Sequence, residues 1–360
     1  KDIYTKSYEF RKADMSDIDE IMAFIRKFWR KNHILASDRD FFMYEHGNND
    51  KSINFVLAIC RSTNAVHAIQ GFIPYSKEEG RLHICGVLSK THPDNNVPYL
   101  GVETMRRMLD MTQPITYCGI GTNPKTWLPL LKKFFNRYVG VMSHYYMLNH
   151  EIDHFRIAAP GHEETSIIPP TIKKTGFSLK IIKTFSEVKN LLSSMHITEE
   201  LPFKGCDYIK RRYLENPYFS YQIYRINEPN GLASGILVTR ETIFRGRKIL
   251  SIIDYIGDIK KLGNGGNIFQ ILLRRNNYEY IDCLCEGIDE SIFNQIGFKK
   301  KTDKTKTVIP IYFQPFIQEN IKIHFEKSHL SMVLFKGDSD ADRPNSNKDI
   351  KEREKLLKSR

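Results

Sequence analysis

The chain has 360 residues, with 54 Lys and Arg against 42 Asp and Glu, which gives a formal net charge of +12 at pH 7. Hydrophobic residues make up 41% of the chain and charged residues 27%, so a packed core is expected and a disordered chain is excluded. No apolar run approaches the roughly 18 to 20 residues of a membrane-spanning helix, which excludes a membrane-spanning protein. The length predicts two or three domains.

The positive charge fits nucleic acid, an anionic membrane surface or a phosphorylated small molecule. Its distribution argues against nucleic acid, because no long Lys/Arg tract with interleaved aromatic residues is present. The six cysteines stand mostly in apolar, strand-like runs, as expected for free thiols in a reducing compartment. No basic stretch followed by an apolar one is visible at the start, so we expect a cytoplasmic protein.

The first half of the chain predicts strands and helices in a defined order. A strand is expected over 8–13, and Ser16 is then expected to cap a helix over 17–29. After a short helix near 39–44, three strands form an antiparallel meander. These strands are expected at 52–60, 65–75 and 81–89, followed by a helix over 102–111, a strand over 115–122, a helix over 127–137 and a strand over 141–148.

The second half repeats the first. Gly71-Phe-Ile-Pro corresponds to Gly235-Ile-Leu-Val after 164 residues, and Gly101 corresponds to Gly265 after the same interval. Arg81 has its counterpart 166 residues later, in Arg247. An ordered series at a nearly constant offset predicts a tandem duplication, with the connection between about residues 150 and 200.

The repeated unit has a strand, a glycine-containing loop, a helix, a strand and a closing helix. In the second copy the loop is Lys260–Gly265, and the closing helix Ser291–Phe298 ends in Gly-Phe. In the first copy the loop is Asn96–Gly101, where Tyr99 replaces one of the two glycines. This arrangement resembles the GNAT superfamily of N-acetyltransferases. The resemblance implies an α/β protein of two tandem GNAT-type domains, each a mostly antiparallel mixed sheet flanked by helices, over 1–150 and 201–336, with a connecting segment 151–200 and a polar tail 337–360.

Two further segments resemble one subgroup of this superfamily. Together with Asp207–Tyr218 and Phe335–Asn345, the pair of domains is similar to tandem-domain N-acyltransferases that act on nucleotide-linked amino sugars, including those of the anthrose pathway. This resemblance implies acyl transfer from acetyl-CoA or a longer acyl-CoA to a sugar amine, without a metal, in the biosynthesis of a surface polysaccharide.

A loop at a helix N-terminus suits the phosphates of coenzyme A, because its N–H groups are unpaired and the helix dipole is positive there. Both copies offer such a loop, and its alternative role is a plain turn. We favour the first copy, since Asn123 resembles the CoA-contacting asparagine of the family, where the second copy has Glu286. The predicted CoA-binding residues are Val87, Leu88, Asn96, Val97, Pro98, Tyr99, Leu100, Gly101, Val102 and Asn123.

Amide formation from a thioester needs a neutral amine, a donor for the oxyanion and acceptors for two protons, so a general base is optional. Strand alternation places His83 and Ser89 on one face, and Asp94 follows the strand. We predict these three as catalytic residues, while a structural role for each histidine stays open. The family often has a tyrosine as proton donor in the last helix, but Phe134 and Phe135 stand there in this chain.

The sugar nucleotide is expected to meet the second copy, and His67, on the strand next to that of His83, is a further predicted substrate contact. Asp254 and Asp258 stand at the matching strand end and could bind sugar hydroxyls or the amine, or simply form turns. Arg211 and Arg343 are candidate diphosphate contacts, because a guanidinium group matches phosphate in a bidentate way, although many arginines are merely exposed.

Other activities have weaker support in the sequence. His150–His154 matches the zinc motif H-E-x-x-H, but no long amphipathic helix surrounds it, so no metal site is predicted. Two alternatives remain open: a transferase that uses aminoacyl-tRNA to modify cell-wall precursors, which the net charge would suit, and a non-catalytic basic binding protein with degenerate domains.

Overall fold

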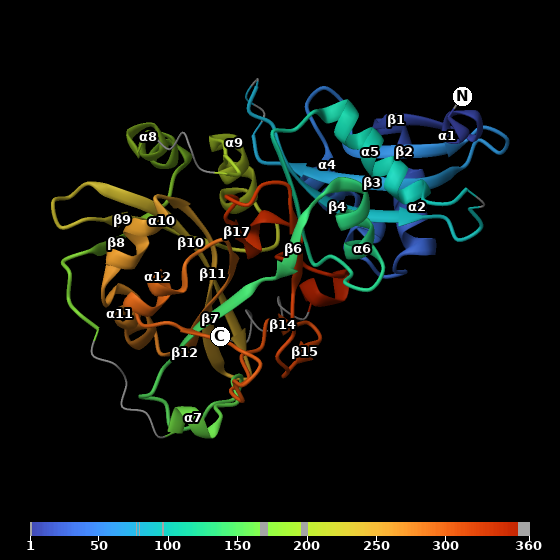
Figure 1. Cartoon of the computed structure of the whole chain (residues 1–360). Coiled ribbons are helices and arrows are strands. Elements are labelled where there is room, and N and C mark those ends of the chain that lie inside the picture. The colour runs from blue at the N-terminus through green and yellow to red at the C-terminus, as the bar shows by residue number, and fades with distance from the viewer. Residues whose placement is uncertain are drawn as a thin grey trace. The chain divides into compact units, whose positions relative to one another are not determined.

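The structure is a computed structural model, and it describes residues 2–76, 78, 80–95, 97–165, 172–195 and 201–351. The chain forms two compact units (Figure 1). The first unit comprises Lys1–Val139, Glu326–Ser328 and Arg343–Arg360, and the second comprises Gly140–Phe325 and His329–Asp342.

The first unit is built on a mixed sheet with the order β1-β2-β3-β4-β5-β16-β6. Neighbours from β1 to β4 are antiparallel, whereas β4 and β5 are parallel. The strands are β1 (Tyr8–Asp14), β2 (Ser52–Cys60), β3 (Val66–Pro74), β4 (His83–Thr91), β5 (Thr116–Ile120), β16 (His324–Lys327) and β6 (Tyr138–Val141). The predicted antiparallel meander and the strand after it are confirmed, with ends that shift by one or two residues.

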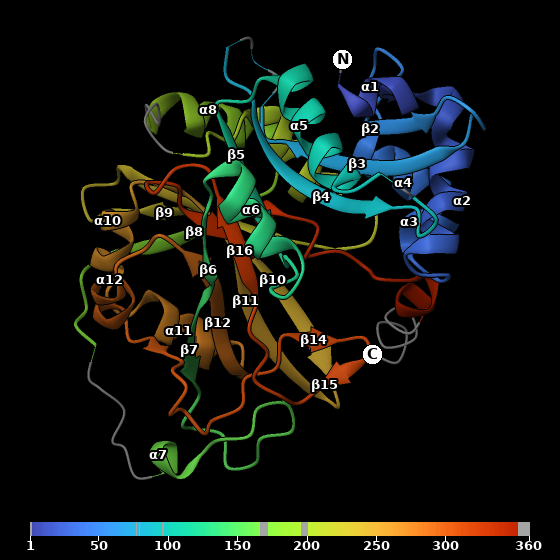
Figure 2. The ribbon, with the colours of Figure 1, turned by 45° about the vertical axis from the view of Figure 1, so that its right-hand side comes forward.

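Two helices cover the face of this sheet from which apolar side chains project. Figure 2 shows α5 (Leu100–Thr112) and α6 (Trp127–Phe135) lying across the strands of the first unit. Their buried side chains pack with residues of β2, β3, β4 and β5 into one core, which consists of Val56, Phe72, Ile84, Met105, Met108, Tyr117, Leu128 and Leu131. The remaining helices are α1 (Ile3–Ser7), α2 (Ile18–Phe28), α3 (Ile34–Ser37) and α4 (Arg39–His46).

The start of α2 differs from the sequence prediction. A 3-10 turn, Met15–Asp17, precedes the helix, and Asp14 caps that turn in place of Ser16. The Asp14 carboxylate accepts a hydrogen bond from the Ser16 N–H, while the Asp17 carboxylate accepts one from the Asp14 N–H. This reciprocal box satisfies two donors that the helix would otherwise leave unpaired.

The second unit repeats the same order of elements. Its sheet has the order β8-β9-β10-β11-β12-β7-β13, and β11 and β12 are its parallel pair. The strands are β8 (Ser178–Ile182), β9 (Gln222–Asn227), β10 (Ala233–Phe244), β11 (Arg247–Gly257), β12 (Tyr278–Glu286), β7 (Ser143–Leu148) and β13 (Lys299–Lys300). The helices are α7 (His162–Thr165), α8 (Phe185–Met195), α9 (Cys206–Ile209), α10 (Ile259–Leu262), α11 (Ile268–Arg275) and α12 (Glu290–Gln295), and the short strands are β14 (Tyr312–Phe313), β15 (Phe316–Ile317) and β17 (Leu334–Phe335).

A matching irregularity marks the two sheets as copies of one fold. In the first, the β3–β4 register shifts so that Leu88 is an extra residue between Val87 and Ser89. In the second, the β10–β11 register shifts so that Ile253 is the extra residue. The two bulges lie 165 positions apart, in line with the offset of the sequence repeat. The predicted tandem α/β architecture is thereby confirmed.

Each sheet includes a strand from the other half of the sequence, which the sequence did not predict. The expected strand 141–148 is interrupted at Met142, and its second part, β7, pairs with β12 and β13 of the second sheet. In turn β16, near the C-terminus, follows β5 in the first sheet. The unit boundaries therefore differ from the predicted 1–150 and 201–336, and the expected connection 151–200 contains β8 and α8. Strand propensity reveals a strand but not its partner.

The segment predicted as a polar tail is largely integrated into the fold. Residues from Lys336 to Asp338 form a 3-10 turn, and Asp338, Ser339 and Asp342 are buried. Further on, the buried Arg343 side chain forms an ion pair with Glu45 of α4, and its Nη2 lies 3.3 Å from His33 Nε2. Arg343 was predicted to bind a diphosphate; this placement differs from that prediction, because the guanidinium group is enclosed by protein.

The six cysteines form no disulfide bond with one another within the described residues. Within the described residues, no helix combines the length and the apolar character that crossing a membrane requires.

Replacing Arg343 by Ala should destabilise the first unit by about 3–5 kcal/mol, because Glu45 would remain buried without its cation. The matched control is Arg39→Ala, since Arg39 pairs with Asp19 at an exposed position and such pairs contribute less than about 1 kcal/mol. Chemical denaturation of both variants measures the difference. Equal, small effects would contradict the structural role assigned to Arg343.

Candidate functional site

The centre of the first sheet contains a gap between two parallel strands. β4 and β5 are paired at His83–Thr116, Ile84–Tyr117 and Cys85–Cys118, and no further pair follows. Among the described residues, no other strand pairs with the β4-side edge of β5 beyond Cys118. The backbone N–H and C=O groups along these two edges are consequently available to a ligand.

The bulge on β4 lies next to this gap. Leu88 adopts a left-handed conformation with φ +47°, which costs energy for a residue with a side chain. The buried Gln70 holds this geometry, because its Nε2 donates to the carbonyl oxygens of Gly71, at 2.9 Å, and Val87, at 3.3 Å. The predicted residues Val87, Leu88 and Ser89 thus lie where β4 departs from β5.

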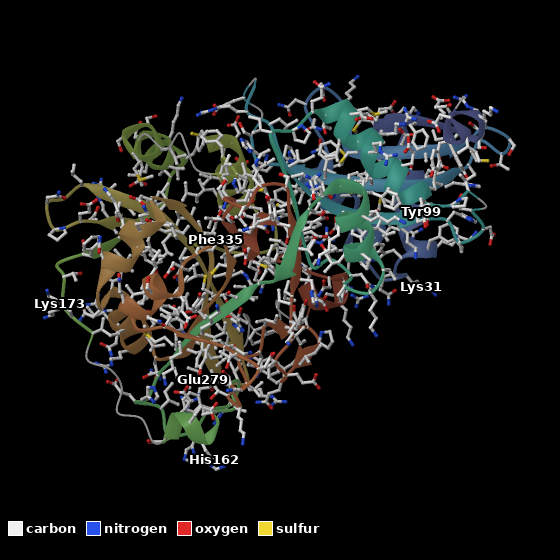
Figure 3. All side chains as sticks on the ribbon, in the orientation of Figure 1. Lys31, Tyr99, His162, Lys173, Glu279 and Phe335 are labelled. Atoms are coloured by element: carbon white, nitrogen blue, oxygen red, sulfur yellow. The ribbon has the colours of Figure 1, made fainter. Side chains whose placement is uncertain are left out.

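The loop after β4 ends at the N-terminus of α5. Tyr99, which is 52% exposed, has φ +59° at the position where the resemblance to the GNAT superfamily leads us to expect glycine, so the left-handed turn is kept with a side chain. Its ring packs on that of Phe134, with 5.2 Å between the centroids (Tyr99 is labelled in Figure 3). The 13-residue α5 then directs the N–H groups of its first turn toward the loop.

Space and charge at this helix start suit an anion. A Cβ on Gly101 would lie 3.3 Å from the Thr91 methyl group, so the glycine keeps the approach to the backbone open. Glu103, the acidic residue of the first turn, is buried and paired with Arg106 and Arg107, which compensate its charge.

The other predicted CoA residues surround the same helix start. Val97 is half-buried and its N–H donates to Asn95 Oδ1, Pro98 is exposed with its carbonyl bonded by the Tyr4 hydroxyl, and Leu100 and Val102 are buried. Asn96 lies outside the described residues. The exposed Asn123 follows β5, and its Oδ1 accepts the N–H groups of Lys125 and Thr126, which leaves its Nδ2 group as a donor for a ligand.

The predicted catalytic residues are not brought together as the alternation suggested. His83 is buried, and its Nδ1 lies 2.8 Å from Thr116 Oγ1. Ser89 is half-buried beyond the bulge, where the extra residue Leu88 shifts the alternation, so the expected shared face with His83 is wrong.

Asp94 belongs to a separate group at the end of β4. Its carboxylate is 87% exposed, and its N–H donates to His92 Nδ1. His92 stacks on His67 with 5.1 Å between the rings, and His67 Nδ1 lies 3.3 Å from the Tyr8 hydroxyl. Burial and the neighbouring His92 lower the pKa of His67, whereas Asp94 opposes this shift.

In the second unit the corresponding gap is occupied by the chain itself. The parallel pairing of β11 with β12 ends at Ile252–Cys283, and the same edge of β12 then pairs with β17, at Cys285–Phe335 and Glu286–Leu334. The opposite edge of β12 pairs with β7 from Tyr280 to Cys285. Phe335, labelled in Figure 3, therefore fills the place that is open in the first unit.

Buried ion pairs hold this inserted segment. Lys204 Nζ lies 2.5 Å from Asp254 Oδ1 and 2.6 Å from Asp338 Oδ1, and the Tyr213 hydroxyl donates to Asp254 Oδ2 at 2.8 Å. Burial disfavours the charge on Lys204, but the two carboxylates outweigh it and raise its pKa. Asp254 was predicted to contact the sugar; this differs from the structure, because its carboxylate is fully enclosed by protein partners.

A second buried group fixes the end of the segment. Asp342 accepts hydrogen bonds from Arg240 Nη2, at 2.6 Å, and from the Tyr221 hydroxyl, at 2.9 Å. Arg212 Nη2 donates to the Ser339 carbonyl at 2.5 Å. The two segments that narrowed the family resemblance, Asp207–Tyr218 and Phe335–Asn345, thus belong to one structural cluster; Arg211 is half-buried beside it.

The glycine-rich loop of the second copy is not a loop. Residues Ile259–Leu262 form α10 and Gly263–Gly265 continue as a 3-10 turn, with Gly265 buried. The exposed Asp258 caps α10, since its carboxylate accepts the Lys260 N–H. The glycines here predicted a loop whose N–H groups bind an anion. The structure instead has helical turns at these residues.

Two residues that the sequence did not single out lie at the gap of the first unit. The hydroxyl of the buried Tyr117 would be 1.8 Å from a Cβ on Gly86, so this phenol extends across to β4 just after the last paired residue. Glu326 of β16 is 2% exposed and packs on Gly119 of β5. Local patterns carry no signal for Glu326, because it joins this sheet from about 200 residues away.

The sequence H-E-x-x-H does not form a metal site. His150 and Glu151 lie in a turn after β7, not on a helix, and the described residues contain no group of three or more His, Cys, Asp or Glu side chains able to hold a metal ion. His150 Nε2 instead lies 4.0 Å from the carboxylate of Glu164.

No family model and no curated protein matches the sequence. Solved structures do resemble it: a GCN5-related N-acetyltransferase from Anabaena variabilis has a TM-score of 0.53 and 12% identity over 89% of this chain and 72% of that one. A probable N-acyltransferase from Enterococcus faecalis has a TM-score of 0.52 and 9% identity over 91% and 73%. These likenesses show that the chain has the fold of GCN5-related N-acetyltransferases.

Replacing Lys204 by Met should destabilise the second unit by about 3–5 kcal/mol, because two buried carboxylates would lose their shared cation. The matched control, Lys210→Met, removes an exposed pair with Glu215 and should cost less than about 1 kcal/mol. Thermal and urea unfolding of both variants check this. A stable Lys204→Met protein with β17 in place would contradict the assigned role of the ion pairs.

Proposed function

We propose that the chain is an acyl-CoA-dependent N-acyltransferase whose CoA site lies in the first unit. The observation that carries this proposal is the contrast between the two gaps: that of the first unit is open beside a helix N-terminus, whereas that of the second is occupied by β17. The names of the similar solved structures, an N-acetyltransferase and a probable N-acyltransferase, support the same class of reaction.

The first unit offers a complementary group for each part of the cosubstrate. The diphosphate would bind the N–H groups at the start of α5, where Gly101 admits a close approach. The amides of the pantetheine arm would pair with the open edges of β4 and β5, and the Nδ2 group of Asn123 would donate to the same arm. The thioester carbonyl would then lie at the bulge around Leu88.

The chemistry needs few protein groups. The amine nitrogen attacks the thioester carbon, and backbone N–H groups at the β4 bulge stabilise the developing oxyanion. Collapse of the intermediate breaks the C–S bond and releases CoA as its thiol. We assign the half-buried Ser89 to orienting the amine, and its position after the bulge supports this. The buried His83 instead contacts Thr116 of β5, so we give it no role toward the substrate.

For the acceptor we propose the amine of a nucleotide-linked amino sugar used in surface-polysaccharide synthesis in the cytoplasm. The family resemblance suggests this substrate, and the net charge of +12 suits two cosubstrates that both carry phosphates. His67 of the first unit remains a proposed contact of this acceptor. Asp258 and Arg211 stay predictions from the sequence, whereas Asp254 and Arg343 are engaged inside the protein.

Placing a carboxylate at the start of α5 should abolish tight CoA binding without harming the fold. We expect Gly101→Glu to weaken acetyl-CoA binding at least tenfold, because the new charge repels the diphosphate while it interacts well with the helix dipole. The matched variant is Asn267→Glu at the start of α11 in the second unit, and it should leave the affinity unchanged. Titration calorimetry with acetyl-CoA measures both.

The reverse pattern, with binding lost only in Asn267→Glu, would move the CoA site to the second unit. If the folded wild type binds no acetyl-CoA, the acyl-CoA proposal fails and a non-catalytic binding protein is favoured. Strongly salt-dependent binding of tRNA in that case would favour the aminoacyl-tRNA-dependent transferase.

A further inference from the structure

Glu326 has an environment that is unusual for a carboxyl group. Its side chain is buried on β16 in the first sheet, and its Oε2 has no hydrogen-bond partner among the described residues. A buried polar group without a partner is costly, so it needs a structural or functional reason.

Its position gives that reason. A Cβ on Gly119 would lie 2.8 Å from Glu326 Oε1 and 3.2 Å from its Cγ, so the absence of a side chain on β5 creates the space for the carboxyl group. Gly119 is the first residue of β5 after the last pair with β4, Cys85–Cys118. The carboxyl group thus lies at the point where the two strands separate.

Tyr117 confirms which face of the sheet this is. It lies two residues before Gly119 and therefore on the same face, and its hydroxyl lies against Gly86, the residue after the last pair on the β4 side. Its ring belongs to the core beneath α5 and α6. α6 carries Phe134 and Phe135, and neither side chain can donate a proton.

Burial keeps Glu326 protonated at neutral pH. Removal from water raises its pKa to about 8, and Arg137 opposes the shift only in part. Tyr117 on β5 is neutral as well, because burial raises its pKa well above 10, with Glu326 and Cys85 adding to the shift. Arg137 lies over the Tyr117 ring, 4.9 Å from its centroid, and is the charged side chain that opposes the shift of the Glu326 pKa.

On the basis of the proposed function, we propose that Glu326 donates the proton that the departing CoA thiolate requires. The C–N bond forms and the C–S bond breaks, the electron pair of that bond stays on sulfur, and sulfur takes the proton of the Glu326 carboxyl group. The carboxylate then recovers a proton through water from the nitrogen that has become an amide. The net reaction moves one proton from amine to thiol, and no further reactant is needed.

The pKa values of donor and acceptor favour this transfer. An alkyl thiol has a pKa near 8.5, so a carboxylic acid with a pKa of about 8 is closely matched to it, whereas an ordinary glutamic acid would already be ionised. Glu326 thereby takes the place of the tyrosine that other members of the superfamily carry in the last helix.

The first measurement separates binding from the chemical step. Glu326→Gln keeps the shape of the neutral acid but cannot donate a carboxyl proton, so acetyl-CoA affinity should stay within about threefold. The release of free thiol, with acetyl-CoA and a panel of UDP- and dTDP-linked amino sugars, should fall about 100-fold. Gly119→Ala should lower the rate in the same direction by displacing the carboxyl group, and Glu9→Gln, exposed on β1, serves as the control.

The pH dependence adds a readout that a structural role would not change. The wild-type rate should fall as the pH rises through about 8, because the acid loses its proton, and Glu326→Gln should lack this alkaline limb. An unchanged rate and pH profile in Glu326→Gln would overturn the proposal while leaving acyl-CoA binding intact. Failure of the wild type to bind acetyl-CoA would instead overturn the proposed function.

Protein stability tests the protonation state without any acceptor. The Glu326 carboxyl group keeps its proton to a higher pH in the folded state than in the unfolded chain. Its contribution to the free energy of unfolding is therefore complete below about pH 4.5 and is lost as the pH rises through about 8. Glu326→Gln should therefore gain thermal stability relative to the wild type between pH 5 and pH 8.5. A difference that does not change with pH would show an ionised Glu326 and contradict the proposal.

Discussion

The structure depends on how backbone hydrogen bonds are satisfied where two parallel strands separate in the middle of a sheet. Backbone N–H and C=O groups on such edges need partners, and a protein can supply them itself or leave them to a ligand. In the second unit β17 supplies them, at Cys285 and Glu286. In the first unit the edges of β4 and β5 stay open next to the start of α5, so the same fold has one closed and one open copy.

The segment that pairs with the strand edge in the second unit is held by buried ion pairs. A segment inserted into a sheet brings polar groups with it, and here Asp338 meets Lys204, whose second partner is Asp254. Burial of this kind stabilises little compared with an apolar core, but removal of one partner is strongly destabilising. These ion pairs therefore stabilise β17 in its place beside β12. They also explain why Asp254 is a structural residue although it stands near the end of a strand.

The sequence predicted most local elements, because helical and alternating patterns are local. The meander from β2 to β4, the helix α5 and the duplication all follow from periodicity and from the glycine series. Three features did not follow. The extra residue Leu88 reverses the alternation between His83 and Ser89, and a bulge has no reliable signature in one sequence. The pairing of β7 with the second sheet spans more than 130 residues, and the contact of Glu326 with Gly119 spans about 200. Strand propensity does not encode such distant pairings. The predicted loop around Gly265 is helical. Glycine content alone does not distinguish an anion-binding loop from a helical turn.

The central claim is that acyl-CoA binds the open gap of the first unit and not the closed one of the second. Hydrogen–deuterium exchange of the full chain, with and without acetyl-CoA, tests it most directly, because a ligand that pairs with strand edges protects their amides. The account predicts slower exchange over residues 86–102 and 119–123, with no change over 252–268 and 334–338. Protection confined to the second set would contradict the account and place the ligand in the unit that we regard as closed.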